Sequence, residues 1–317
     1  MAGCGDKFED WRLRGWERCN HETLYPTNDE KFWGANFFKF EGNNYQGSDQ
    51  PYIVYESPYK TEHFYNMIVK TNMRVLVNVS TKNDNIAYRK DYPLNLHFLN
   101  LNQTLNLEQN VSVTCFKEEN HNLKNDEKVL IKYLRINNET QSYECRQLIY
   151  QHWEDGEKYK TLEDRFKVNQ NTIESLLELV ELTDNNLKEL SPNSSYSQGL
   201  AVTGKYGFGR SPAFIVMFEI YKQIKSEISK QKNIPINDIK SIFDYSDVIT
   251  ILDLDANSFL AAMSEKVMTG AGEIHLQEVI GLFNAIKQKA KNITKPHDPD
   301  SLRNKFEESE KSFAIHK

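Results

Sequence analysis

The feature that most constrains the fold is a glycine-rich turn between an apolar strand and an apolar helix. Residues 200–218 have the sequence LAVTGKYGFGRSPAFIVMF. Glycines let successive N–H groups point inward, and the start of a helix carries partial positive charge, so such a turn can bind an anion. Arg210, at the start of the helix, can donate two hydrogen bonds to phosphate oxygens. A plain strand–helix turn is the alternative, and the absence of a closing Gly-Lys-Ser/Thr excludes a Walker-type loop.

Length and composition limit the class of protein. The chain has 317 residues, of which 39% are hydrophobic and 26% charged, as in globular proteins. A net charge of -6 argues against a general nucleic-acid binder. No apolar run is long enough for a membrane span, the charged N-terminus lacks a signal-peptide core, and the four cysteines lack metal-ligand spacing. We therefore expect a cytoplasmic protein with no metal or other cofactor and no nucleic-acid or membrane partner.

Hydrophobic patterns indicate a strand-rich first half and a helical second half. Strands are predicted at 52–55, 75–79, 111–116, 129–136 and 143–152, with a helix at 61–70 and a polar loop at 117–127. Helices are predicted at 172–182, 212–228, 248–263 and 274–286, the first with Asn171 as its N-cap. These patterns favour one α+β domain over residues 1–293, with a helical extension at 1–20 and a charged tail at 294–317.

The glycine-rich segment resembles the signature loop of protein-tyrosine phosphatases, His-Cys-x-x-Gly-x-Gly-Arg-Ser/Thr-Gly. The matching residues are Gly207, Gly209, Arg210 and Ser211, whereas Gly204 occupies the position of the catalytic cysteine. Further segments resemble family motifs in the family's order, among them YIVYESP at 52–58, HFYNMIV at 63–69 and WED at 153–155, the last at the place of the mobile Trp-Pro-Asp loop. The resemblance implies a three-layer α/β/α fold with a central, mixed, highly twisted sheet flanked by helices.

The resemblance also implies roles for particular residues. A phosphate would be held by seven consecutive residues, Lys205, Tyr206, Gly207, Phe208, Gly209, Arg210 and Ser211. Asp155 matches the general acid, and Thr269 takes the place of the glutamine that positions water. His21 matches the tyrosine that stacks on phosphotyrosine, and Trp153 is a further candidate for substrate recognition.

Departures from the family pattern predict a loss of phosphatase chemistry. The family's thiolate attacks phosphorus, and glycine at position 204 supplies no nucleophile. The loop histidine is Thr203, the proline of the acid loop is Glu154, and the glutamine is Thr269. Losing a covalent nucleophile usually lowers the rate by several powers of ten. No catalytic residue is therefore assigned, and Gly204, Asp155 and Thr269 are degenerate positions.

Three functions stay open on the sequence alone. A pseudophosphatase would bind tyrosine-phosphorylated or other protein partners, with an anion in the loop and no turnover. An interaction scaffold would have a vestigial pocket blocked by Tyr206. A residual phosphatase would use Asp155 and a water molecule. The divergent, Asn- and Lys-rich chain also resembles polydnavirus (bracovirus) phosphatases, a family with inactive members, and this resemblance implies a viral modulator of signalling or immunity in the host-cell cytoplasm.

Overall fold

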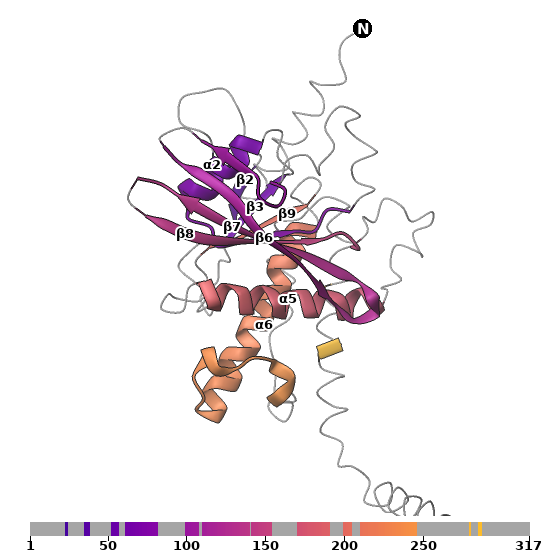
Figure 1. The fold of residues 1–317 in the computed structure, drawn as a ribbon. Helices are drawn as coiled ribbons and strands as arrows, with labels where there is room; N and C mark the ends of the chain where they lie inside the picture. The colour runs from indigo at the N-terminus through magenta and orange to yellow at the C-terminus, as the bar shows by residue number, and fades with distance from the viewer. Residues whose placement is uncertain are drawn as a thin grey trace, which may run out of the picture. The chain divides into compact units, whose positions relative to one another are not determined.

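The fold is that of a computed structural model (Figure 1). It describes residues 23–24, 35–38, 52–56, 61–81, 99–107, 110–139, 141–153, 170–190, 199–204 and 210–245, together with 279, 285 and 286. The chain forms two compact units, Met1–Lys222 with Asp255–Phe283, and Gln223–Leu254 with Asn284–Lys317. The expected single domain over 1–293 and the tail at 294–317 stay predictions.

The part of the chain that the structure describes forms one mixed sheet of nine strands in the first unit. The strands are β1 (Thr23–Leu24), β2 (Ala35–Phe38), β3 (Tyr52–Glu56), β4 (Val75–Asn78), β5 (Thr104–Asn106), β6 (Ser112–Asn122), β7 (Lys128–Asn137), β8 (Ser142–Tyr150) and β9 (Leu200–Gly204). Their order is β1-β2-β3-β9-β4-β8-β7-β6-β5. The strands β3, β9, β4 and β8 are parallel neighbours, and antiparallel strands continue the sheet on both sides.

Helices cover both faces of the sheet. The main helices described are α2 (Thr61–Thr71), α5 (Gln170–Leu190) and α6 (Arg210–Lys232), with short 3-10 turns at Lys124–Asp126, Ile236–Asp238 and Ile242–Tyr245. Cys145 packs into the core on the α2 face, whereas the next residue, Arg146, bonds Asn186 of α5 at 2.6 Å on the opposite face. Figure 1 shows α2 and α5 on opposite sides of the strands. The expected α+β fold with a mixed central sheet is confirmed.

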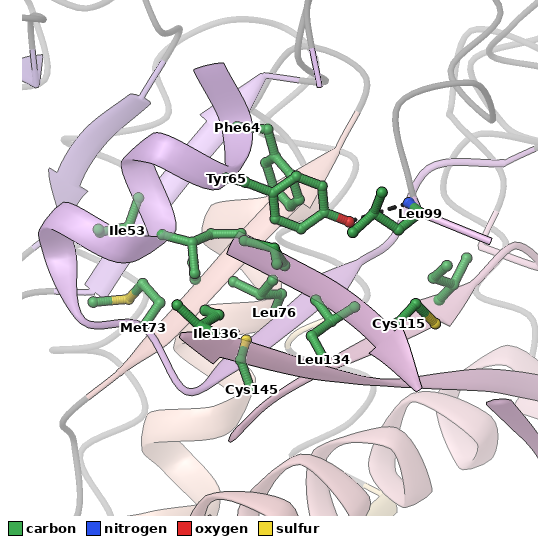
Figure 2. Packing of buried hydrophobic residues seen from close by; sticks show 14 residues of the cluster. Ile53, Phe64, Tyr65, Met73, Leu76, Leu99, Cys115, Leu134, Ile136 and Cys145 are labelled. Atoms are coloured by element: carbon green, nitrogen blue, oxygen red, sulfur yellow. Dashed lines mark hydrogen bonds between the residues drawn. The ribbon is translucent and has the colours of Figure 1, made fainter. Parts of the chain in front are cut away.

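The core on the α2 face contains a small group of buried polar contacts. The Leu99 N–H donates to the Tyr65 hydroxyl oxygen at 3.2 Å, the bond drawn in Figure 2. Lys132 Nζ donates to the Leu99 carbonyl at 2.8 Å and lies 2.9 Å from a Glu118 carboxylate oxygen. Burial raises the pKa of Tyr65 well above its ordinary value, so this hydroxyl stays protonated. These bonds attach the segment that begins at Leu99 to both α2 and the sheet.

Two details of the predicted elements are wrong. The polar stretch 117–122 is strand and not loop, because after a register shift between Cys115 and Lys117 it pairs with β7 as far as Asn122. Main-chain pairing and cross-strand contacts, such as the hydrogen bond that the Tyr133 hydroxyl of β7 donates to the Glu119 carboxylate, stabilise it without an apolar pattern. The helix α5 begins at Gln170, so Asn171 lies inside it rather than at its cap.

The other predicted elements either match the structure or lie outside the residues that it describes. Four strands appear where they were predicted: β3, β4, β7 and β8 correspond to 52–55, 75–79, 129–136 and 143–152. Two helices do as well: α2 and α6 correspond to 61–70 and 212–228. The extension at 1–20 and the helix predicted at 248–263 lie outside the described residues; of 274–286, only Val279, Ala285 and Ile286 are described. Among the helices described, none combines the length and apolar character that a membrane span requires.

Candidate anion site at the end of β9

The candidate site lies at the edge of the sheet where the four parallel strands end. β3 ends at Glu56, β4 at Asn78, β8 at Tyr150 and β9 at Gly204. Sheets with parallel strands commonly bind ligands beyond the carboxyl ends of those strands. The Val79 N–H donates to the Thr203 carbonyl at 2.9 Å, so the pairing of β4 and β9 continues to this edge. β9 lies between β3 and β4 and ends here at Gly204.

Arg210 links two parts of this edge that are distant in the sequence. It is the first residue of α6 and is only 3% exposed. Its Nη1 donates a hydrogen bond of 2.7 Å to the main-chain oxygen of Trp153, three residues beyond the end of β8. β4 lies between β8 and β9 in the sheet, so this bond joins segments that follow non-adjacent strands. The guanidinium therefore has a defined position at the start of the helix.

Trp153 was predicted as a recognition residue on the basis of the resemblance. Its side chain is fully buried, and its main-chain oxygen is the group that contacts Arg210. Sequence reasoning missed this main-chain contact, because nothing in the local pattern at 153 indicates which residue will approach its carbonyl. A contact between the Trp153 ring and a ligand stays a prediction.

Gly204 and Ser211 face each other across the start of α6. A Cβ at position 204 would lie 2.9 Å from Ser211 Oγ, closer than real Cβ contacts allow, and 3.8 Å from Ser211 N and from Val79 Cγ2. The Ser211 side chain is fully buried. Its hydroxyl has no hydrogen-bond partner among the residues that the structure describes. The serine hydroxyl therefore occupies space that a side chain at position 204 would need.

The described nucleophilic side chains offer no evident replacement for the thiolate. Thr203 is fully buried, and its hydroxyl donates a long bond of 3.4 Å to the carbonyl of Gly204. Cys115 and Cys145 belong to the buried cluster on the α2 face. Burial raises the pKa of Cys115 to about 11 and that of Cys145 to about 12, so both thiols are protonated near neutral pH. Protonated, buried thiols are poor nucleophiles.

The structure thus brings together Gly204, Arg210, Ser211 and Trp153 out of the predicted site. The other predicted positions lie outside the described residues, and their roles stay predictions; they are Lys205, Tyr206, Gly207, Phe208, Gly209, Asp155, Glu154, Thr269 and His21. Val79 was predicted only as part of a strand, yet its side chain lies beside Gly204. The parallel pairing of β4 with β9 creates that contact, and neither segment alone indicates it.

Comparison with known proteins identifies the family. The family model for protein-tyrosine phosphatases matches residues 19–243. A solved structure of PTPN18, described for its fingerprint on distinct HER2 tyrosine phosphorylation sites, is similar with a TM-score of 0.51 and 14% identity, over 82% of this chain and 73% of that one. A structure of PTPN18 in complex with HER2-pY1248 phosphopeptides has a TM-score of 0.49 and 15% identity, over 80% of this chain and 76% of that one. At such identities the likeness shows the fold alone.

No curated protein matches the sequence. The family model nevertheless covers well over half of the 317 residues. It includes the whole sheet from β1 to β9 and all of α6, hence the edge at which Arg210 and Gly204 lie. The chain therefore belongs to the protein-tyrosine phosphatase family.

Proposed function

We propose that this chain is a catalytically inactive phosphatase-like protein that binds phosphorylated protein partners without hydrolysing them. The observation that carries the proposal is the combination of Gly204 with Arg210. Glycine stands where the family has its cysteine nucleophile, while the arginine of the same loop is retained at the start of α6. The chain therefore keeps a means of binding phosphate and lacks the group that would attack it.

The geometry around Arg210 supports an anion site. A helix of 23 residues begins at Arg210, and its first N–H groups, together with the helix dipole, favour an anion at that end. The bond from Nη1 to the Trp153 carbonyl orients the guanidinium. A guanidinium carries five N–H donors, so a bond to a carbonyl is compatible with binding phosphate oxygens. Gly207 and Gly209, which precede the helix, would add main-chain donors.

An interaction scaffold with a vestigial pocket is a second candidate, and one observation favours it. Arg210 is almost fully enclosed and already bonded to main chain, as a purely structural arginine would be. In that case the guanidinium would fasten α6 to the segment after β8, and Tyr206 would block the pocket. Binding of an anion separates the two functions, because only the first requires it.

The setting that we propose follows from the resemblance to bracovirus phosphatases. An inactive phosphatase domain in the cytoplasm of an infected host cell would compete with active enzymes for phosphorylated signalling proteins. The solved PTPN18 structure concerns HER2 tyrosine phosphorylation sites, which supports phosphotyrosine as the first modification to test. Shielding of such sites would modulate host signalling or immunity without any turnover by this chain.

The test is calorimetric titration of the purified chain with inorganic phosphate and with a tyrosine peptide in phosphorylated and unphosphorylated forms. We expect binding of phosphate and of the phosphorylated peptide only. Arg210→Ala should weaken it by about 100-fold, the effect of losing a paired, charge-assisted contact of about 3 kcal/mol. Arg135→Ala, which removes an exposed arginine on β7, is the matched control and should leave binding unchanged.

Two results would redirect the assignment. Absence of phosphate and phosphopeptide binding by the unaltered chain would refute the proposal and leave the scaffold function. Hydrolysis of p-nitrophenyl phosphate that disappears in Asp155→Ala would instead support the residual phosphatase, in which Asp155 and a water act without the cysteine.

A further inference from the structure

The tip of the β6–β7 hairpin contains two consecutive residues in a backbone conformation that favours glycine. Asn125 has a φ of 63° and Asp126 a φ of 59°. The Leu123 N–H donates to the Glu127 carbonyl at 2.8 Å and closes this turn, which lies beside α5 (Figure 1). Residues other than glycine are strained in that conformation and persist where the surrounding structure holds them. The other contacts of the turn are therefore informative.

One of these contacts joins the turn to the end of β8. The hydroxyl of Tyr150, the last residue of that strand, donates a hydrogen bond of 2.6 Å to a Glu127 carboxylate oxygen. The Tyr150 side chain is fully buried, so the bond has a defined direction on the tyrosine side. Short hydrogen bonds from a hydroxyl to a carboxylate are among the stronger ones in proteins. Glu127 thus helps to fix the point at which the chain leaves β8.

The segment that leaves β8 carries the acceptor that orients Arg210. Trp153 lies three residues beyond Tyr150, and its main-chain oxygen accepts the 2.7 Å bond from Arg210 Nη1. Between them, the His152 ring lies 5.6 Å from the Tyr150 ring. Because the Trp153 side chain is also fully buried, this short link has little freedom to absorb a displacement at Tyr150. A shift at one end is therefore transmitted to the other.

We propose that Glu127 is a positioning residue for the phosphate site. Through Tyr150 it sets the place of the Trp153 carbonyl, and that carbonyl sets the direction of the Arg210 guanidinium. The inference rests on the proposed function, because it concerns the affinity of that site for phosphate. A guanidinium binds phosphate best when its planar donors are already aligned with the phosphate oxygens. Loss of the bond between Tyr150 and Glu127 reduces this alignment and leaves Arg210 itself in the site.

The test compares two tyrosines that make the same kind of bond on the same sheet. Tyr150→Phe removes the bond to Glu127, and Tyr133→Phe, the matched control, removes the bond that the Tyr133 hydroxyl donates to Glu119. Both variants keep the ring and lose one hydrogen bond, so both should have a slightly lower melting temperature. Calorimetric titration of the full chain with inorganic phosphate should show about fivefold weaker binding in Tyr150→Phe and unchanged binding in Tyr133→Phe.

Variants of Glu127 separate positioning from a general loss of stability. Glu127→Gln keeps an oxygen that can accept the bond from Tyr150, so it should bind phosphate nearly as tightly as the unaltered chain. Glu127→Ala should reproduce the loss in Tyr150→Phe. Equal phosphate affinity in Tyr150→Phe and the unaltered chain, or an equal loss in Tyr133→Phe, would overturn the inference and leave the proposed function standing. Failure of the unaltered chain to bind phosphate would overturn both.

Discussion

Replacing Gly204 with cysteine tests whether one missing thiol accounts for the proposed loss of catalysis. Gly204 ends β9 and does not adopt the left-handed backbone that only glycine accepts easily, so the main chain tolerates a Cβ there. The obstacle is Ser211 Oγ at 2.9 Å, since the other nearest atoms, Ser211 N and Val79 Cγ2, lie at an ordinary 3.8 Å. Rotation of one small side chain relieves the clash.

The expected change in stability is small because two terms oppose each other. Moving Ser211 out of its preferred rotamer costs about 0.5–1.5 kcal/mol. Replacing a glycine inside a strand restores about 0.5–1 kcal/mol by restricting the unfolded chain. We therefore expect the free energy of unfolding of Gly204→Cys to lie within about 1 kcal/mol of the unaltered chain. For a domain of this size, the melting temperature then changes by no more than about 4 °C.

Activity is measured with p-nitrophenyl phosphate, and Gly204→Ala serves as the control that adds the Cβ without the thiol. We expect both variants to remain near background, because Thr203, Glu154 and Thr269 also depart from the catalytic pattern. Turnover of Gly204→Cys at about 1 s⁻¹ or more, the lower end of typical enzymes, would refute this reasoning. It would mean that the wider loss of catalytic groups had been overestimated. A loss of stability above about 3 kcal/mol would instead refute the steric argument.

Two further predictions concern stability and the thiols. Gly199 has a φ of +100°, and a Cβ there would lie 2.8 Å from the main-chain N of Arg74. Gly199→Ala should therefore lower the free energy of unfolding, measured by urea denaturation, by at least about 2 kcal/mol. Gly204→Ala, at the other end of β9, is the contrasting variant, because its backbone accepts a Cβ. Because the pKa values of Cys115 and Cys145 are raised to about 11 and about 12, both thiols should resist iodoacetamide at pH 8 in the native chain and react once it is unfolded. Equal alkylation of these two thiols in native and unfolded protein would contradict this explanation. For the same reason the free energy of unfolding should fall as the pH rises above about 9, where the unfolded state loses thiol protons that the folded state keeps.

The sequence predicts the local elements and the general location of the site better than it predicts their contacts. Apolar residues are frequent in β4, β7, β8 and the first half of α6, and these elements appear as expected. It fails over residues 117–122, where pairing with β7 imposes strand on polar residues. The resemblance indicated Gly204 and Arg210, but the bond from Arg210 to the Trp153 carbonyl joins residues 57 positions apart that no local pattern relates. The direction of the Ser211 hydroxyl is likewise a property of the assembled edge.

The strand order has a consequence for how the candidate site is assembled during folding. β9 pairs with β3 and β4, whose residues lie more than 120 positions earlier in the chain. Pairings over such separations require closure of long loops and form slowly compared with hairpins such as β6–β7–β8. β8 and β9 each pair with β4, and we expect the bond between Arg210 and Trp153 to form once both pairings are in place. Protection of the amide protons around Trp153 from hydrogen exchange should therefore appear late in refolding, when Arg210 and the segment after β8 come together.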